Sequence, residues 1–87
     1  MDTPWTVYIL QCSDGSLYTG VARDLQRRLM QHNGVLVGGS RYTRGRRPVQ
    51  LLWSDPAPDR SAAQRREASI KKLSRDEKLR LARAVLK

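Results

Sequence analysis

The sequence predicts an α/β fold whose elements follow the order β-β-α-β-α-α. Two runs rich in β-branched and aromatic residues lie within residues 5–21, and a third lies at 49–53. Apolar side chains at helical spacing, with helix start signals before them, occupy residues 25–32 and the chain beyond residue 60. The 87 residues contain no repeat and no linker, so we expect one domain spanning 1–87.

A β-hairpin is expected at the start of the chain. Residues 5–12 (Trp-Thr-Val-Tyr-Ile-Leu-Gln-Cys) predict a strand buried on both faces. The Asp-Gly pair at 14–15 is a strong turn signal, and residues 17–21 predict the returning strand. Gly20, near its end, indicates a close approach between the backbone and another group.

A short helix is predicted over residues 25–32. Asp24 is a suitable N-cap, and Leu25 and Leu29 lie four residues apart on one helical face. The Asn-Gly pair at 33–34 ends this helix.

The segment 38–47 is expected to form a flexible basic loop, which Pro48 closes. It contains Tyr42 among four arginines, namely Arg41, Arg44, Arg46 and Arg47. Composition leaves two interpretations open. The loop is either an arm that binds phosphate groups or a solvated basic segment with no fixed partner.

One strand and two helices are predicted for the remaining chain. Residues 49–53 favour a third strand, and the Asp-Pro-Ala-Pro sequence at 55–58 favours a turn. Capping boxes that open on Ser61 and on Ser74 indicate two helices, the first ending at about Leu73 and the second near Leu86.

The charge balance indicates a polyanionic partner. Lysine and arginine total 17 against 8 acidic residues, which gives a net charge of +9 and a pI near 10.9. Nucleic acid is the first candidate, because neutralising its phosphates releases counterions. A basic protein embedded in a large RNA–protein assembly would carry a similar charge.

Composition also excludes several classes of protein. The only cysteine, Cys12, can form neither an internal disulfide nor a cysteine-rich zinc site, and its apolar surroundings predict a place in the core. No apolar stretch is long enough to cross a membrane, and the first residues do not resemble a signal peptide. We therefore expect a cytoplasmic protein with no membrane partner.

Glu67 is an unusual residue for its position. It falls within the stripe that Ala63, Ile70 and Leu73 should turn inward. A carboxylate on an apolar face needs a partner, which could be an arginine or a hard cation such as Mg²⁺. The alternative, favoured for this residue in isolation, is an ordinary surface ion pair with Lys71 one turn later.

Four further side chains could carry chemistry. Arg28 and His32 lie on one flank of the 25–32 helix, where they could contact a phosphoryl group or a water molecule. The alternative, favoured for His32 in isolation, is an exposed basic helix end. Tyr8 and Tyr18 lie on paired strands and could place two phenol oxygens side by side. The alternative for each phenol is a simple hydrogen-bond partner in the core.

Read in order, these residues resemble the GIY-YIG nuclease superfamily. Thr-Val-Tyr at 6–8 and Tyr-Thr-Gly at 18–20, separated by nine residues, resemble its paired motif. The following residues 21–33 (Val-Ala-Arg-Asp-Leu-Gln-Arg-Arg-Leu-Met-Gln-His-Asn) continue as that family does. The match covers nearly the whole chain and is closest to the small stand-alone bacterial branch.

The resemblance implies a compact α/β domain with a central antiparallel sheet of three strands flanked by helices. It also implies hydrolysis of phosphodiester bonds with one divalent metal ion, Mg²⁺ or Mn²⁺. The substrate would be nucleic acid, with DNA favoured over RNA. Cleavage would be selective for structure or ends, with a role in DNA repair or processing.

The resemblance also assigns roles to single residues. Glu67 would hold the metal, Arg28 would neutralise the phosphate in the transition state, and Tyr8 would activate the water. Tyr18 and His32 would position the nucleophile and the phosphate. These five catalytic residues should converge on one concave, positive patch. The candidates for contacts with the nucleic-acid backbone are Arg23, Arg41, Arg44, Arg46 and Arg47.

One departure supports a second hypothesis. Many family members carry an asparagine after the glutamate helix, but no asparagine follows Glu67. The alternative is therefore a catalytically weak or inactive nucleic-acid-binding module on the same scaffold.

Overall fold

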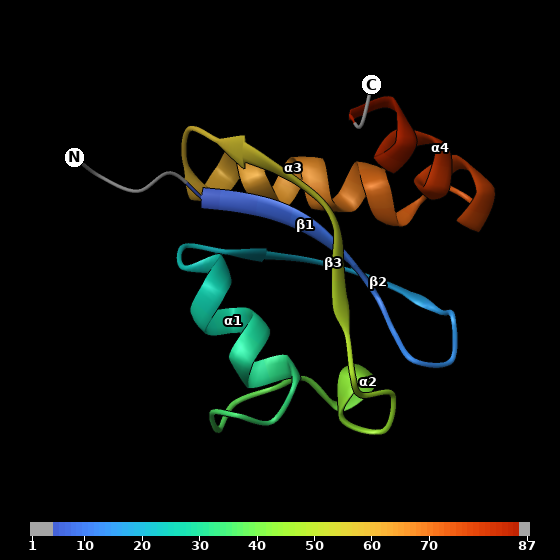
Figure 1. The fold of residues 1–87 in the computed structure, drawn as a ribbon. Helices are drawn as coiled ribbons and strands as arrows, with labels where there is room; N and C mark the ends of the chain where they lie inside the picture. Colours follow the sequence, from blue (N-terminus) through green and yellow to red (C-terminus); the bar gives the residue numbers. More distant parts are fainter. Residues whose placement is uncertain (1–4, 86–87) are drawn as a thin grey trace.

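The computed structural model describes residues 5–85, which form a three-stranded antiparallel sheet with helices on both faces (Figure 1). The strands are β1 (Trp5–Gln11), β2 (Leu17–Ala22) and β3 (Gln50–Ala57). The helices are α1 (Leu25–His32), α2 (Arg41–Arg44), α3 (Arg60–Lys71) and α4 (Arg75–Val85). The sheet has the order β2-β1-β3, so β1 is the central strand. The predicted α/β fold is confirmed.

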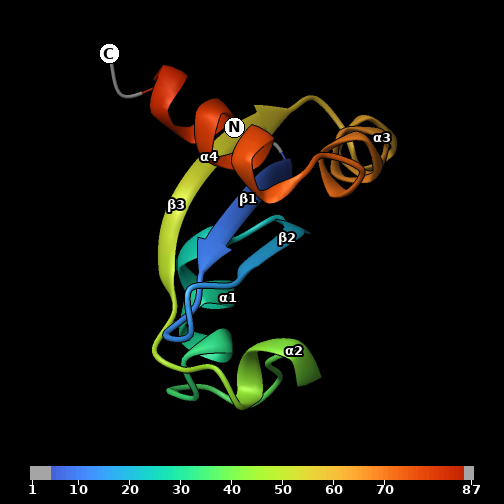
Figure 2. The ribbon, with the colours of Figure 1, turned by 90° about the vertical axis from the view of Figure 1, so that its right-hand side faces the viewer.

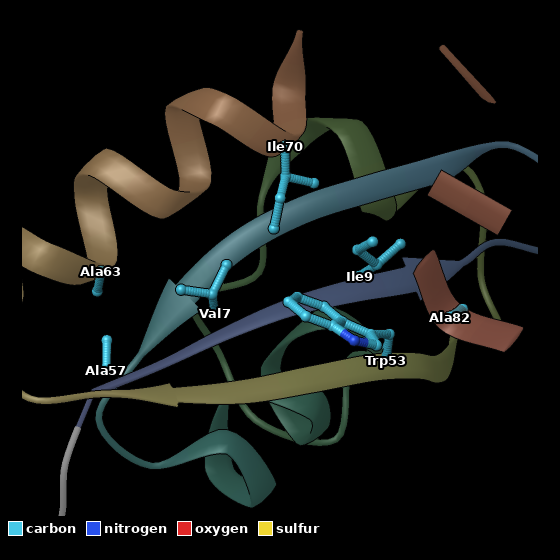
Figure 3. Packing of buried hydrophobic residues seen from close by; sticks show 7 residues of the cluster. All are labelled: Val7, Ile9, Trp53, Ala57, Ala63, Ile70 and Ala82. Carbon is cyan, nitrogen blue, oxygen red and sulfur yellow. The ribbon is translucent and has the colours of Figure 1, made fainter. Parts of the chain in front are cut away.

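Alternation along β1 assigns a different core to each face of the sheet. Val7 and Ile9 point toward α3 and α4, where they pack with Trp53 and Ile70 (Figure 3). Because successive residues of a strand point to opposite faces, Tyr8 points the other way.

The second core lies between the sheet and α1 (Figure 2). Tyr8, Leu10 and Cys12 are buried there, and Leu25 and Leu29 of α1 pack against them. The two leucines thus form the inward face that their spacing predicts. Cys12 is a buried free thiol, as expected.

The third strand is longer than predicted. It begins at Gln50 and continues to Ala57, so the turn predicted at 55–58 is wrong. Pro56 pairs with Thr6 in the ladder. An edge strand tolerates proline, which has no N–H to donate, and β3 is an edge strand. A register irregularity opposite Ile9 and Leu10 bends this long strand.

Two predictions about helices also need correction. The segment expected to be a flexible loop contains the one-turn helix α2, whose N-cap Ser40 accepts a hydrogen bond from the backbone of Thr43. The first helix after the sheet begins at Arg60, because Asp59, and not Ser61, accepts from the backbone N–H of Ala62 at 2.8 Å.

The remaining helix boundaries match the sequence signals. Asp24 caps α1, accepting from the Arg27 backbone at 3.0 Å. Ser74 and Glu77 form the predicted reciprocal capping box of α4. The predicted end of α4 near Leu86 lies outside the described residues. Over residues 5–85, every helix is too short or too polar to pass through a lipid bilayer.

Candidate functional site

The β1–β2 hairpin brings the two motif tyrosines together. Tyr8 pairs directly with Gly20 across the ladder, and the ring centroids of Tyr8 and Tyr18 lie 6.4 Å apart. A Cβ atom at position 20 would lie only 2.6 Å from the Tyr8 hydroxyl and 3.1 Å from the Tyr18 ring. Glycine is therefore required here, and the close approach indicated by the sequence is that of the tyrosine side chains.

His32 joins this pair from the last turn of α1. Its side chain is fully buried, so the exposed helix end considered from the sequence is wrong for this residue. His32 Nε2 lies 2.9 Å from the Tyr8 hydroxyl oxygen. On its other side, His32 Nδ1 lies 2.9 Å from the Thr43 hydroxyl oxygen in α2. The imidazole ring thus connects the sheet to α2 through two buried hydrogen bonds.

The surroundings of Thr43 favour one direction of this hydrogen-bonded chain, in which Thr43 donates to Ser40, although Ser40 Oγ at 3.0 Å can either donate to the Thr43 hydroxyl or accept from it. The Thr43 hydroxyl is placed to donate to the Ser40 carbonyl oxygen at 3.2 Å. It then accepts from the N–H on His32 Nδ1, which leaves Nε2 as an acceptor for the Tyr8 hydroxyl. Sequence reasoning did not single out Thr43. The Ser-x-x-Thr spacing at 40–43 signals a helix start, but nothing local connects it to His32.

Burial and local charge keep both partners neutral at neutral pH. Desolvation raises the pKa of Tyr8 to about 12, and the nearby Tyr18 and Glu67 act in the same direction, whereas Arg28 opposes them. Desolvation also lowers the pKa of His32 to about 4, with the positive charges of Arg28 and Arg47 adding to it. A neutral imidazole agrees with the hydrogen-bond directions above.

Arg28 is held beside the pair. Its Nη1 donates to Gln31 Oε1 at 2.8 Å and to the Gly38 carbonyl oxygen at 2.7 Å. The side chain is only partly exposed, and its charge acts on both Tyr8 and His32. Tyr8, Tyr18, Arg28 and His32 thus form one cluster on the α1 side of the sheet.

Glu67 approaches from a different element. Helix α3 packs on the face of the sheet opposite α1 (Figure 1), next to β1 and the edge strand β2. The Glu67 carboxylate lies 3.4 Å from Lys71 Nζ, which is the ion pair considered from the sequence, and its side chain is 23% exposed. Its charge nevertheless reaches the Tyr8 phenol and raises the pKa of that group. Glu67 is therefore electrostatically coupled to Tyr8, although its helix packs on the other face of the sheet.

A metal ion at this place would have few protein ligands. Within residues 5–85, no three histidine, cysteine, aspartate or glutamate side chains are grouped to hold a cation. One partly exposed carboxylate suits Mg²⁺, which commonly binds one or two carboxylates and keeps several waters. The expected hollow is not preformed, because this part of the chain contains no pocket.

The basic segment is more ordered than expected. Arg47 Nε donates to the His32 carbonyl oxygen at 2.7 Å, and the Arg46 guanidinium lies 4.1 Å from the centre of the Tyr42 ring. These two arginines therefore have fixed contacts within the protein. Arg41 and Arg44 are exposed on α2. The fifth candidate, Arg23, directly follows β2, and its guanidinium lies 5.8 Å from the centre of the Trp5 ring at the start of β1.

Comparison with known proteins finds a matching family model and similar sequences over most of the chain. A family model described as the GIY-YIG catalytic domain matches residues 4–80. A UPF0213 protein of Desulfotalea psychrophila is 49% identical over 80 residues, which are 92% of this chain and 72% of the relative. A UPF0213 protein of Staphylococcus saprophyticus is 47% identical over 75 residues, covering 86% and 89% of the two chains.

Two solution NMR structures share the fold. One is a UPF0213 protein of Bacillus halodurans, 41% identical, with a TM-score of 0.58 over 92% of this chain and 83% of the other. The second is a protein of E. faecalis, 32% identical, with a TM-score of 0.62 over 100% of this chain and 94% of the other. Motif, fold and relatives agree, and this chain belongs to the GIY-YIG catalytic domain family.

Proposed function

We propose that this protein is a metal-dependent nuclease that hydrolyses phosphodiester bonds, with DNA as its preferred substrate. The observation that carries the proposal is the buried hydrogen bond between the Tyr8 hydroxyl and a neutral His32. A phenol in contact with a vacant imidazole nitrogen can receive one proton while it passes on another. The family assignment supports the same reaction class.

Tyr8 can act as a general base although its phenol is protonated at neutral pH, because it can pass its own proton to His32. Tyr8 has a pKa near 12, so its phenol stays protonated at neutral pH. As the attacking water loses a proton to the Tyr8 oxygen, the phenol proton moves to His32 Nε2. Because the pKa of His32 is about 4, the imidazolium then returns this proton to the Tyr8 oxygen, and Tyr8 passes the proton taken from water to the leaving oxygen or to solvent. Tyr8 and His32 thus act as one proton-transferring unit.

The other cluster residues act on the phosphate. Arg28 contributes a fixed positive charge beside Tyr8, where it would stabilise the charge that develops on the phosphoryl oxygens. The Tyr18 ring lies 5.1 Å from the His32 ring and would position the nucleophile. Arg23, Arg41, Arg44, Arg46 and Arg47 remain the candidates for contacts with the nucleic acid, which would position the substrate without reading its sequence.

Glu67 is the residue that would hold Mg²⁺ or Mn²⁺. When bound, such an ion stabilises charge on the leaving oxygen. The Glu67 carboxylate lies 3.4 Å from Lys71 Nζ. To bind a metal ion, it must either break this ion pair or interact with both cations at once. This competition favours a weakly held cation that binds together with substrate.

The experiment compares wild type with Tyr8→Phe and Glu67→Gln on plasmid, branched and single-stranded DNA, and on the corresponding RNA, with Mg²⁺ or Mn²⁺. We expect cleavage by wild type only in the presence of a metal ion. Tyr8→Phe should lose about 10²–10⁴-fold in rate, the range for a general base. Lys72→Gln, at the C-cap of α3, serves as the charge-changing control. Equal product patterns for wild type and Glu67→Gln would reject the proposed activity.

A second candidate function is nucleic-acid binding without hydrolysis. It is favoured by the Glu67–Lys71 ion pair, which occupies the only candidate metal ligand, and by the net charge of +9. It predicts salt-dependent binding that Glu67→Ala leaves intact, and no turnover under any metal condition.

A further inference from the structure

We propose that Tyr42 and Arg46 form a stacking site for an unpaired nucleobase next to the reacting phosphate. The proposal rests on the proposed function only for the position of that phosphate, because the stacking site itself would bind nucleic acid whether or not cleavage occurs. It identifies the substrates as single strands, ends or branches, in which a base is free to leave its neighbours.

The first observation is a continuous series of rings from the buried cluster to the surface. The Tyr18 ring lies 5.1 Å from the His32 ring and 5.6 Å from the Tyr42 ring. Tyr42 is 37% exposed, and the Arg46 guanidinium lies over its ring at 4.1 Å. A base stacked at the outer end of this series would therefore be a short distance along the strand from Tyr8 and His32.

The second observation is the way in which Arg46 is held. Its Nε donates to Asp14 Oδ2 at 3.1 Å, and its Nη1 donates to the Tyr42 carbonyl oxygen at 2.8 Å. The side chain remains 39% exposed. These contacts fix the plane of the guanidinium, while the carboxylate partly neutralises its charge. A fixed plane with reduced charge suits a flat, uncharged ligand better than a phosphate group, and Arg46 is therefore reassigned from a backbone contact to a base contact.

The chemistry of the ligand follows from this geometry. Unpaired bases stack on aromatic rings and on arginine guanidinium planes, and such stacking tolerates every base. In a duplex, each base is already covered by its neighbours, so stacking on Arg46 would require extrusion of the base. The site therefore favours nucleotides that are unpaired before binding.

The test measures binding without divalent cations, so that cleavage cannot occur. Two fluorescent single strands of about ten nucleotides are compared separately. The first carries normal bases, and the second has the same backbone with abasic positions. Wild type should bind the normal strand about ten-fold more tightly than the abasic strand, because only the first can stack. Arg46→Lys keeps the positive charge but removes the guanidinium plane, and Tyr42→Leu removes the aromatic ring. Each variant should bind the normal and the abasic strand with nearly equal affinity.

Three controls separate stacking from charge. Arg65→Lys makes the same change at an exposed arginine of α3 that is not among the proposed nucleic-acid contacts, and it should keep the preference for the normal strand. Tyr42→Phe keeps the ring and should do the same. Thermal unfolding identifies any variant that fails to fold. The proposal is overturned if wild type binds both strands equally, or if Arg65→Lys removes the preference as Arg46→Lys does. Loss of cleavage alone would bear on the nuclease proposal and leave this one standing.

Discussion

At the scale of single residues, His32 owes its properties to burial at a helix end. A histidine at the last turn of an exposed helix would be favoured in its charged form by the helix dipole. Here the side chain is fully buried between Tyr8 and Thr43, with Arg28 nearby, and the desolvated neutral form prevails. The same residue type at the same helical position thus acts as a hydrogen-bond acceptor and not as a surface cation.

This neutral state predicts a dependence of stability on pH. The pKa of His32 is about 4 in the folded protein, against an ordinary histidine pKa of 6.5, so the unfolded chain binds more protons between these two values. The contribution to stability is therefore complete above about pH 6.5 and is lost as the pH falls through 4. We expect the free energy of unfolding to drop by about 3 kcal/mol over this interval.

Denaturant unfolding at a series of pH values measures this drop, and NMR titration of the only histidine reports its pKa directly. His32→Asn should remove the pH dependence between about pH 6.5 and pH 5, where the carboxylates contribute little. A histidine that titrates near its ordinary value in the folded protein would contradict the buried neutral pair.

Thr43 provides a second prediction at this scale. Thr43→Val preserves the shape of the side chain but leaves the N–H on His32 Nδ1 without an acceptor, at a cost of about 1–3 kcal/mol. We expect a lower kcat with little change in KM, because the ring loses its preferred tautomer. Thr43→Ser should restore the rate. The nitrogen chemical shifts of His32 should report an N–H on Nδ1 in wild type and in Thr43→Ser, and a mixture of tautomers in Thr43→Val. Unchanged shifts in Thr43→Val would remove the positioning role.

The sequence allowed the residues of the site to be named more readily than their contacts. Tyr8, Tyr18, Arg28 and His32 could be identified from motif spacing, because the hairpin and α1 are local structures. Thr43 could not, since its contact with His32 depends on how α2 packs on α1. The coupling of Glu67 to Tyr8 likewise depends on the position of α3 beside the sheet edge.

At the scale of elements, local signals predicted helix starts well where only one candidate cap existed. Asp24 and Ser74 are examples. They failed where two signals competed, because Asp59 and Ser61 both precede the apolar face of α3. The length of β3 was missed for a tertiary reason. Its last residues, including Pro56, are held by pairing with β1, which overrides the local preference of Asp-Pro for a turn.

The correction at α3 leads to a matched prediction. Asp59→Ala removes the side chain that accepts from the Ala62 backbone, so it should destabilise the protein by about 1 kcal/mol. Ser61→Ala removes only a contact with the exposed Arg65 side chain and should change stability by less than about 0.5 kcal/mol. Urea unfolding of both variants decides between the two caps. A larger loss for Ser61→Ala would show that the helix begins at the serine.

At the scale of the whole molecule, the fold positions the candidate site, whereas the surface charge favours binding of a polyanion. The sheet and its two cores position the cluster, while the net charge of +9 comes from arginines and lysines distributed over the surface. Composition predicted the charge and its polyanionic partner class directly. It could not show which arginines have fixed contacts within the protein, because Arg47 and Arg46 are held by atoms of other segments.

This division predicts how binding to nucleic acid depends on salt. The logarithm of the binding constant should fall linearly with the logarithm of the salt concentration, with a slope of about −0.9 for each phosphate neutralised on duplex DNA. Arg41→Gln and Arg44→Gln change exposed side chains of α2 and should each reduce the slope by about one phosphate contact without loss of stability. Arg47→Gln should instead lower the free energy of unfolding, because Arg47 Nε donates to the His32 carbonyl oxygen. Fluorescence anisotropy between about 50 and 200 mM salt gives the slopes. A slope that Arg41→Gln and Arg44→Gln both leave unchanged would move the phosphate-binding surface away from α2, toward the exposed Arg23 beside Trp5.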